Sequence, residues 1–255
     1  MQASSPHEGA YTSRDFWRGY WQAKGPLATV IPERFPLTEI LDDVLRRHRV
    51  RTSLELGGFP GHYSLWLQKY RGVAAELLDF VIDRQQFAAL LAKNDLAPDA
   101  VRTIEADLFT HVPDKRYDLV YSLGLIEHFT DTRAIIEKHL AYLADDGVLL
   151  IEIPNFRGLN GLVQRTFDRD MYDKHNIACM DPRFLQRTCE ELGLVVERAG
   201  FHARFGVWLE EADTKPRLLR WAVTSLSLLG QAAFKLLPIQ TLQFSPYIVL
   251  VARRR

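Results

Sequence analysis

The residues best suited to chemistry begin at a glycine-rich segment, Leu54-Glu55-Leu56-Gly57-Gly58-Phe59-Pro60-Gly61, which continues a short apolar run. Glycine lets a backbone bend sharply and approach a ligand without a Cβ atom in the way. A strand that leads through such a turn into a helix is typical of Rossmann-like nucleotide sites. Taken alone, the segment predicts a nucleotide-binding fold and no particular ligand.

Three carboxylates narrow the choice of ligand. Glu55 comes directly before the glycines, and Asp107 follows the third apolar run. Asp79 ends the second run, twenty-two residues beyond Gly57, where a carboxylate can accept hydrogen bonds from both hydroxyls of a ribose. The G-x-G-x-x-G pattern of dinucleotide sites is absent. The pattern therefore favours a nucleoside that carries an amine and no phosphate, and it disfavours NAD(P).

Five motifs in this order resemble those of the class I (Rossmann-like) S-adenosylmethionine-dependent methyltransferases. They are Glu55-x-Gly57-x-x-x-Gly61, Asp79, Ala106-Asp107, the run from Asp118 to Phe129, and the run from Asp146 to Ile151. The resemblance covers about Ser53 to Phe201, and Tyr247–Ala252 fits the last strand of the family. It implies S-adenosylmethionine as the cofactor, S-adenosylhomocysteine as the product, and methyl transfer by in-line displacement.

The resemblance also implies the cofactor contacts: the glycine loop for the methionine part, Asp79 for the ribose and Asp107 for the adenine. The full set is Glu55, Gly57, Gly58, Gly61, Asp79, Phe80, Asp107, Leu108, Ser122 and Leu123. One residue departs from the family pattern, because Phe59 stands where acidic-x-Gly-x-Gly-x-Gly has its middle glycine. Its side chain either crowds the cofactor or faces the core.

A catalytic base is not universal in such enzymes, because the cofactor supplies an activated carbon. The candidate is His128, whose imidazole has a pKa suited to proton transfer near neutrality. The alternative is that Glu127-His128 forms a structural turn that caps the following helix. Some relatives bind a divalent metal through Glu-x-x-Glu-His, but Gly124 replaces the first glutamate here. We therefore expect no metal.

Polar and aromatic side chains outside these motifs are candidates for the acceptor pocket. A polar cluster follows the fifth apolar run and is either a lid or an exposed loop. Aromatic residues recur at helical spacing between Tyr11 and Trp21, and this helix either closes over the cofactor or packs as an ordinary cap. The candidate acceptor contacts are Tyr20, Asn155, Tyr172, His175 and Asn176.

The elements that must position these residues alternate between strands and helices, which is typical of a mostly parallel sheet. The expected strands are Thr52–Leu56, Val73–Asp79, Val101–Glu105, Tyr117–Ser122, Val148–Ile153, Leu194–Glu197 extending towards Arg204, and Tyr247–Ala252. The expected helices are Tyr63–Lys69, Arg84–Lys93, Thr132–Leu143 and one from Pro182 to Glu191. The pattern and the resemblance predict an α/β fold with a doubly wound, mostly parallel seven-stranded sheet, an antiparallel last strand, and helical cap segments.

We expect one methyltransferase domain over 1–255, with an N-terminal cap at 1–38 and insertions at 154–180 and 206–245 over the substrate side. Within the last insertion, a helix ends before Pro238. Its predicted apolar face is Leu219, Ala222, Leu226, Leu229, Ala233 and Leu236. This helix either packs on its own domain, covers a pocket, joins a second subunit or touches a membrane surface through 217–237.

Composition favours a small-molecule acceptor. Lys+Arg and Asp+Glu each total 32, so the chain lacks the basic excess of a nucleic-acid binder. It has no stretch of about 18 apolar residues, no apolar leader, and only the cysteines Cys179 and Cys189, which predicts a cytoplasmic protein with reduced thiols. A protein or nucleic-acid methyltransferase and a catalytically silent binding protein are the alternatives.

Overall fold

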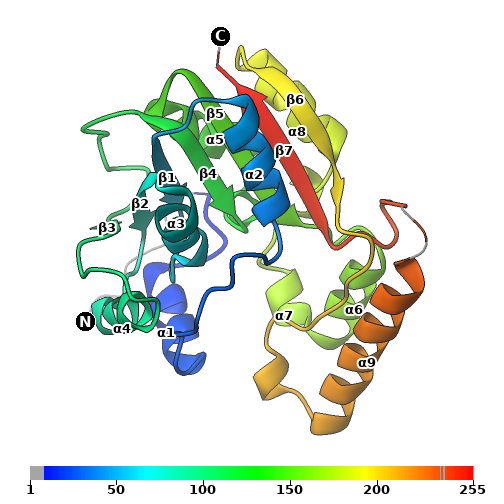
Figure 1. The fold of residues 1–255 in the computed structure, drawn as a ribbon. Helices are drawn as coiled ribbons and strands as arrows, with labels where there is room; N and C mark the ends of the chain where they lie inside the picture. The colour runs from blue at the N-terminus through cyan, green and yellow to red at the C-terminus, as the bar shows by residue number, and fades with distance from the viewer. Residues whose placement is uncertain (1–8, 236, 238, 255) are drawn as a thin grey trace.

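A seven-stranded sheet forms the centre of the computed structural model, which describes residues 9–235, 237 and 239–254 (Figure 1). Its strand order is β3-β2-β1-β4-β5-β7-β6, and only β7 runs antiparallel to its neighbours. The strands are β1 (Thr52–Leu56), β2 (Ala74–Asp79), β3 (Arg102–Glu105), β4 (Tyr117–Leu123), β5 (Leu143–Pro154), β6 (Val195–His202) and β7 (Tyr247–Arg253). The predicted fold class is confirmed.

Helices cover both faces of this sheet, as a doubly wound fold requires. On one face α2 (Thr38–Arg47), α3 (His62–Trp66) and α4 (Arg84–Lys93) share a hydrophobic core with Leu119 and Tyr121 of β4. On the other face α5 (Thr132–Tyr142) and α8 (Pro182–Glu191) share a second core with Val120 of the same strand. Successive strand residues thus enter opposite cores, which explains why the strands are almost continuously apolar.

Local signals place the helix starts. Asp83 accepts hydrogen bonds from the N–H groups of Gln85 and Gln86, and Asp181 precedes Pro182 at the first helical position. Such caps satisfy N–H groups that have no partner within the helix. The predicted limits of α4 and α8 are therefore reproduced.

Two elements differ from their predicted limits by more than two residues. The helix after the glycine loop is shorter than expected and continues as a π-helical turn, Leu67–Arg71, which Gly72 ends with a φ of 65°. Strand β5 begins five residues early, at Leu143, because Leu143 pairs with Tyr117 across a bulge. Neither difference moves the ends of the strands at which the site lies.

The cap segments gather at the edge of the sheet where the parallel strands end (Figure 1). They contain α1 (Arg14–Ala23), α6 (Leu159–Phe167), α7 (Arg169–Tyr172), α9 (Arg217–Phe234) and the 3₁₀ turns Ile177–Cys179 and Ala212–Thr214. Helix α9 rests on a small separate core that includes Val163, Phe205, Val207 and Val223.

The buried face of α9 is not the one predicted. Leu229 of the predicted apolar face is 71% exposed, whereas Val223 is only 7% exposed. The Phe205 ring lies where a Cβ atom on Gly230 would stand, 2.2 Å from the Phe205 Cε1 atom. The helix therefore packs through the face that carries Gly230, because only a small residue leaves room for the Phe205 ring. Apolar periodicity does not show this preference. Leu236 and Pro238, which completed the prediction, lie outside the described residues.

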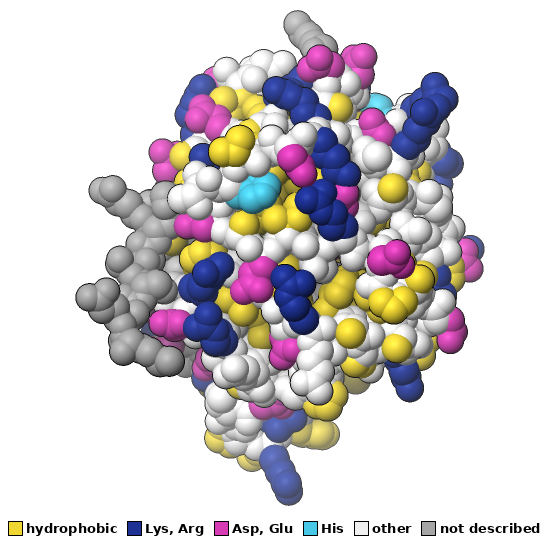
Figure 2. All heavy atoms as spheres, turned by 90° about the vertical axis from the view of Figure 1, so that its left-hand side faces the viewer, with side chains coloured by type: hydrophobic (Ala, Val, Ile, Leu, Met, Phe, Trp, Pro, Cys, Tyr) yellow, Lys and Arg dark blue, Asp and Glu magenta, His cyan; other side chains and the backbone are white. Residues whose placement is uncertain are grey.

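Three expectations about the whole chain can be compared with the structure. Cys179 and Cys189 are both buried and unpaired, as predicted. Among the helices that the structure describes, none is long and apolar enough to cross a membrane. On the face drawn in Figure 2, Lys and Arg side chains are interspersed with Asp and Glu and form no continuous basic surface.

Candidate active site

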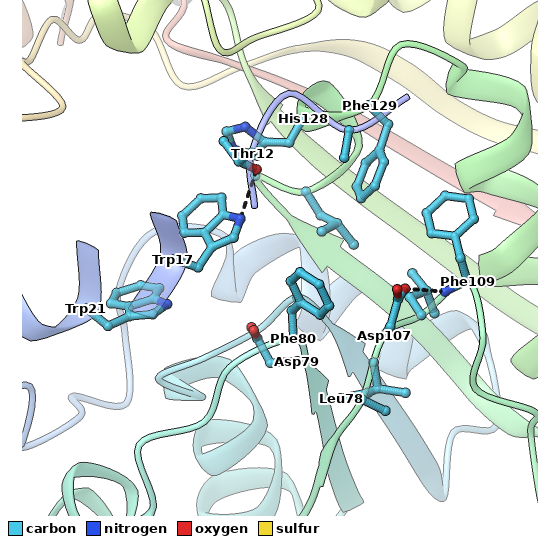
Figure 3. Close-up of a pocket in the computed structure, with 16 residues that line it drawn as sticks. Thr12, Trp17, Trp21, Leu78, Asp79, Phe80, Asp107, Phe109, His128 and Phe129 are labelled. Atoms are coloured by element: carbon cyan, nitrogen blue, oxygen red, sulfur yellow. Dashed lines mark hydrogen bonds between the residues drawn. The ribbon is translucent and has the colours of Figure 1, made fainter. Parts of the chain in front are cut away.

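A first cavity opens where β1, β2 and β4 end, with about 750 Å³ of empty space (Figure 3). Trp17 and Trp21 approach it from α1, and Asp79 and Phe80 from the end of β2. Its lining residues are Ala10, Thr12, Trp17, Trp21, Gly57, Leu78, Asp79, Phe80, Ala106, Asp107, Leu108, Phe109, Gly124, Leu125, His128 and Phe129. Five of the predicted cofactor contacts are therefore together: Gly57, Asp79, Phe80, Asp107 and Leu108.

The glycine loop is held tightly against its neighbours. Gly57 has a φ of 63°, and a Cβ atom there would lie 2.6 Å from Leu125 Cδ1. A Cβ atom on Gly58 would lie 2.2 Å from Glu55 Cγ. A side chain at either position would force the loop away from the strand ends, so both glycines are required by close approach.

Asp79 connects the loop to the second strand. One of its carboxylate oxygens accepts a hydrogen bond from Phe59 N–H at 2.9 Å, and the other accepts from Val81 N–H at 3.0 Å. Each oxygen keeps an acceptor position free for a ligand. Burial raises the pKa of Asp79 to about 6, although the backbone hydrogen bonds act in the opposite direction. Asp79 is thus a buried carboxyl group that two backbone N–H groups hold in place at the edge of the cavity.

Asp107 lies on the opposite side of the cavity from α1 (Figure 3), and Leu108 also lines the cavity. The Asp107 carboxylate accepts a hydrogen bond from Phe109 N–H at 2.8 Å, which fixes the turn after β3. Ala106 N–H donates to the Asp79 carbonyl at 2.9 Å, so the ends of β2 and β3 are joined. These contacts hold the two predicted acidic positions at a fixed separation.

Glu55 and Ser122 are turned away from both cavities described here. The Glu55 carboxylate accepts hydrogen bonds from the Ser64 hydroxyl at 2.6 Å and from the Tyr121 hydroxyl at 3.0 Å. The Ser122 hydroxyl bonds to His139 Nε2 at 2.8 Å on α5. Both side chains therefore support the loop and strand from within the core, unlike the direct contacts that the resemblance implied.

Gly58 and Gly61 likewise line neither cavity. Gly61 instead precedes α3 in the left-handed region, with a φ of 92°.

Phe59 faces the core. It is 3% exposed, and its ring packs edge-to-face on Trp21 with centroids 5.2 Å apart. It does not line the first cavity, so the departure from the family pattern leaves that space open. The phenyl ring instead joins the glycine loop to helix α1.

A second cavity, with about 890 Å³ of empty space, adjoins the first through shared residues that include Trp17, Gly57 and His128. It is lined by Trp17, Tyr20, Trp21, Gly57, Phe59, Leu123, Gly124, Glu127, His128, Glu152, Ile153, Pro154, His175, Trp208, Glu210 and Tyr247. Of the predicted acceptor contacts, Tyr20 and His175 are here, together with the candidate base His128 and the predicted cofactor contact Leu123.

The other three acceptor predictions have structural surroundings and do not line this cavity. The Asn155 amide donates to the carbonyls of Leu242 and Ser245, both at 2.8 Å. The Asn176 amide donates to the Phe129 carbonyl at 3.0 Å, while the Tyr172 ring stacks on Phe156. The sequence placed these residues in the right segment, but their polar atoms are used to fold it.

The second cavity holds several ionisable groups whose neutral forms burial favours. Burial raises the pKa of Glu127 to about 8 and that of Glu152 to about 8, and it also raises the pKa of Glu210. Burial lowers the pKa of His128 to about 3, with a smaller contribution from His175. Desolvation of the charged form is the main cause of each of these shifts.

His128 has a defined tautomer. Its Nδ1 lies 3.1 Å from the Lys174 carbonyl, which can only accept, so Nδ1 carries the proton and Nε2 keeps its lone pair. Trp17 packs edge-to-face on the ring at 5.0 Å. His128 is part of the 3₁₀ turn after β4 and also lines both cavities.

Several lining residues were not among the predicted contacts. Glu152 had a detectable signal, since it is a lone carboxylate in the otherwise apolar run from Val148 to Pro154. Trp208 and Glu210 had none, because their segment is neither periodic nor part of a motif. They are joined by a hydrogen bond of 2.7 Å between Trp208 Nε1 and a Glu210 oxygen.

Comparisons with known proteins agree with this arrangement. A family model described as "Methyltransferase domain" matches residues 33–199. No curated protein sequence matches the chain.

Solved structures share the fold at low identity. A SAM-dependent methyltransferase from Geobacter sulfurreducens, in complex with S-adenosyl-L-homocysteine, is similar with a TM-score of 0.55 and 16% identity over 93% of this chain and 98% of that one. One from Archaeoglobus fulgidus has a TM-score of 0.51 and 19% identity over 85% and 94%. Geranyl diphosphate C-methyltransferase from Streptomyces coelicolor A3(2) has a TM-score of 0.56 and 13% identity over 86% and 78%.

Replacing Asn155 tests its structural role. Asn155→Ala leaves the carbonyls of Leu242 and Ser245 without their donors. We expect the free energy of unfolding to fall by about 2 kcal/mol, measured by urea denaturation. Gln186→Ala on the exposed face of α8 is the control and should change it by less than about 0.5 kcal/mol. An unchanged stability in Asn155→Ala would contradict the structural role.

Glu152→Gln tests the desolvation of the second cavity. Because the pKa of Glu152 is about 8 in the fold and about 4.3 in an unfolded chain, the folded state holds its proton through a window in which the unfolded state loses it. Stability of the natural protein should therefore fall as pH rises from about 4 to 8. The glutamine variant lacks this loss, so its relative stability should increase across the same window.

The measurement is the free energy of unfolding of both proteins, from urea denaturation between pH 5 and pH 8.5, with a difference on the order of a few kcal/mol at the upper end. Glu105→Gln, at an exposed carboxylate on β3, is the control and should show no such trend. A difference that stays constant with pH would mean that Glu152 is already ionised in the fold.

Proposed function

The chain belongs to the methyltransferase-domain family as a class I S-adenosylmethionine-dependent methyltransferase, and we propose that it methylates a small molecule held in the second cavity. The observation that carries the proposal is the pair of adjoining cavities, one at the predicted cofactor residues and one enclosed by the cap segments.

In the proposed complex, the nucleoside of S-adenosylmethionine occupies the first cavity. Asp79 receives the ribose hydroxyls at the end of β2, and Asp107 with Leu108 borders the adenine. The backbone of Gly57 then lies beside the methionine part. Glu55 contributes indirectly, by holding Ser64 and so the loop, and not through its own contact with the cofactor.

The methyl group would pass at the junction of the two cavities, near Gly124 and His128. An oxygen, nitrogen or carbon nucleophile attacks the methyl carbon in line with the departing sulfur. A hydroxyl or amino acceptor loses a proton in this reaction, and the free Nε2 of His128 can take it. The lowered pKa of His128 makes it a weak base, but one that is unprotonated at neutral pH.

Three features support a small acceptor over a protein or nucleic acid. Helix α1 crosses one side of the second cavity with Tyr20 and Trp21, and the later insertion closes another with Trp208. The chain has no excess of basic residues. The geranyl diphosphate enzyme with a similar fold also has a small acceptor. A cytoplasmic location, predicted from the sequence, belongs to the same proposal.

Cofactor binding is tested by thermal shift with S-adenosylhomocysteine and with NAD. The former should stabilise the protein by about 2.7 kcal/mol at one hundred times its Kd, and NAD should not. In Asp79→Asn, the loss of charged hydrogen bonds to the ribose should weaken binding at least about 10-fold. Glu105→Gln, the register partner of Asp79 on β3, is the matched control. Equal shifts in both variants would remove Asp79 from the site.

The size class of the acceptor is tested by incubating the protein with S-adenosylmethionine and fractions of a cell extract. The S-adenosylhomocysteine formed with each fraction is measured. We expect turnover with the dialysable fraction and none with the retained macromolecules. His128→Gln should slow this turnover by roughly 10²-fold or more while the cofactor-induced thermal shift persists. His111→Gln, whose ring bonds to Tyr142 outside both cavities, is the control. Turnover on the macromolecular fraction alone would overturn the small-acceptor proposal.

A further inference from the structure

Three buried side chains converge beside the second cavity. Glu127 and His128 lie on the 3₁₀ turn after β4, and His175 comes from the loop after α7, almost fifty residues later. One donor atom from each lies within 4.8 Å of the other two. The three residues are 1%, 6% and 7% exposed, respectively.

The carboxylate of this cluster is unsatisfied. Glu127 Oε2 is buried and has no hydrogen-bond partner among the residues that the structure describes. Leaving such an atom without a partner costs about 1–3 kcal/mol or more. Two imidazoles lie close to this carboxyl group. A ligand bound between the three side chains would supply the partner that the oxygen lacks.

Both imidazoles present a lone pair. His175 Nδ1 lies 2.7 Å from the Met171 carbonyl, just as His128 Nδ1 lies 3.1 Å from that of Lys174. Each Nδ1 must therefore carry the proton, and each Nε2 is a free acceptor. A histidine that binds a metal through Nε2 typically donates its other N–H to a carbonyl in this way.

The rings are also fixed by packing. Trp17 lies edge-on to His128 at 5.0 Å, and Phe156 lies edge-on to His175 at 4.9 Å. The two imidazole centroids are 4.7 Å apart.

We propose that Glu127, His128 and His175 bind a divalent first-row transition-metal ion. Two imidazole nitrogens and one carboxylate oxygen suit Zn²⁺ or Fe²⁺ better than Mg²⁺, which prefers oxygen ligands. The sequence predicts no metal, because Gly124 leaves the motif after β4 incomplete. The third proposed ligand, His175, comes from a distant segment that sequence spacing does not connect with this motif. Three protein ligands leave positions open, and all three residues line the second cavity, where an acceptor oxygen can reach the ion. With the ion bound, His128 Nε2 is a ligand and no longer a base; the ion would then lower the pKa of a bound acceptor hydroxyl in its place.

The ion-binding test uses the full chain, which is first stripped of metals with a chelator and then incubated with Zn²⁺. After gel filtration removes unbound metal, we expect about one Zn²⁺ per chain, measured by elemental analysis. Competition with a chromophoric chelator gives the affinity. Mg²⁺ in large excess should not displace the zinc, because it is a poor partner for imidazole.

Two conservative variants identify the ligands. Glu127→Gln and His175→Gln should each weaken zinc binding at least about 10-fold. His48→Ala, a histidine paired with Glu197 away from the cavity, is the control for adventitious binding and should bind as the natural protein does. Thermal unfolding and the shift with S-adenosylhomocysteine report that the His175 variant is folded with an intact first cavity.

Zinc retention that His48→Ala abolishes, or that both cavity variants leave unchanged, would mean an adventitious ion only. Absence of zinc from the natural protein would also overturn the proposal. Neither result depends on methyl transfer, so the metal proposal and the proposed function can fail separately.

Discussion

The parallel pairing of β1 with β2 on one side and with β4 on the other is the constraint on which the site depends. The strand order reverses between β1 and β4, so the chain leaves these strands towards opposite faces of the sheet. A crevice at such a switch point is the usual ligand site of a doubly wound fold. Here it brings the glycine loop, Asp79 and His128 together, although the sequence separates them widely.

Close approach at this crevice is maintained by groups that never face the ligand. Glu55 holds Ser64 and Tyr121, Ser122 holds His139, and Asp79 holds the backbone of Phe59. These hydrogen bonds lie in a region almost without water, where an unpaired polar group is costly. The polar residues of the motifs therefore divide into those that support the loop and those that line the cavities.

The N-terminal segment covers the site because its backbone pairs with the segment that follows β4. Tyr11 N–H donates to the His128 carbonyl at 2.9 Å, and Thr130 N–H donates to the Gly9 carbonyl at 2.8 Å. This short ladder places α1 so that Trp17 packs on His128 and Trp21 on Phe59. Aromatic side chains of the cap thus shield the cavities from water and restrict the imidazole at their junction.

The sequence by itself determined the features that depend on near neighbours. Apolar runs predicted the strands, helical patterns predicted α4 and α8, and positions at the ends of the second and third apolar runs predicted Asp79 and Asp107. Only the tertiary structure decided which polar side chains face the cavities. In that structure the Asn155 side chain bonds to backbone carbonyls, Val223 of α9 is buried where Leu229 is exposed, and His175 lies close to Glu127. The reason is physical: caps and periodicity act within a few residues, whereas side-chain direction in irregular segments is set by packing against distant parts of the chain.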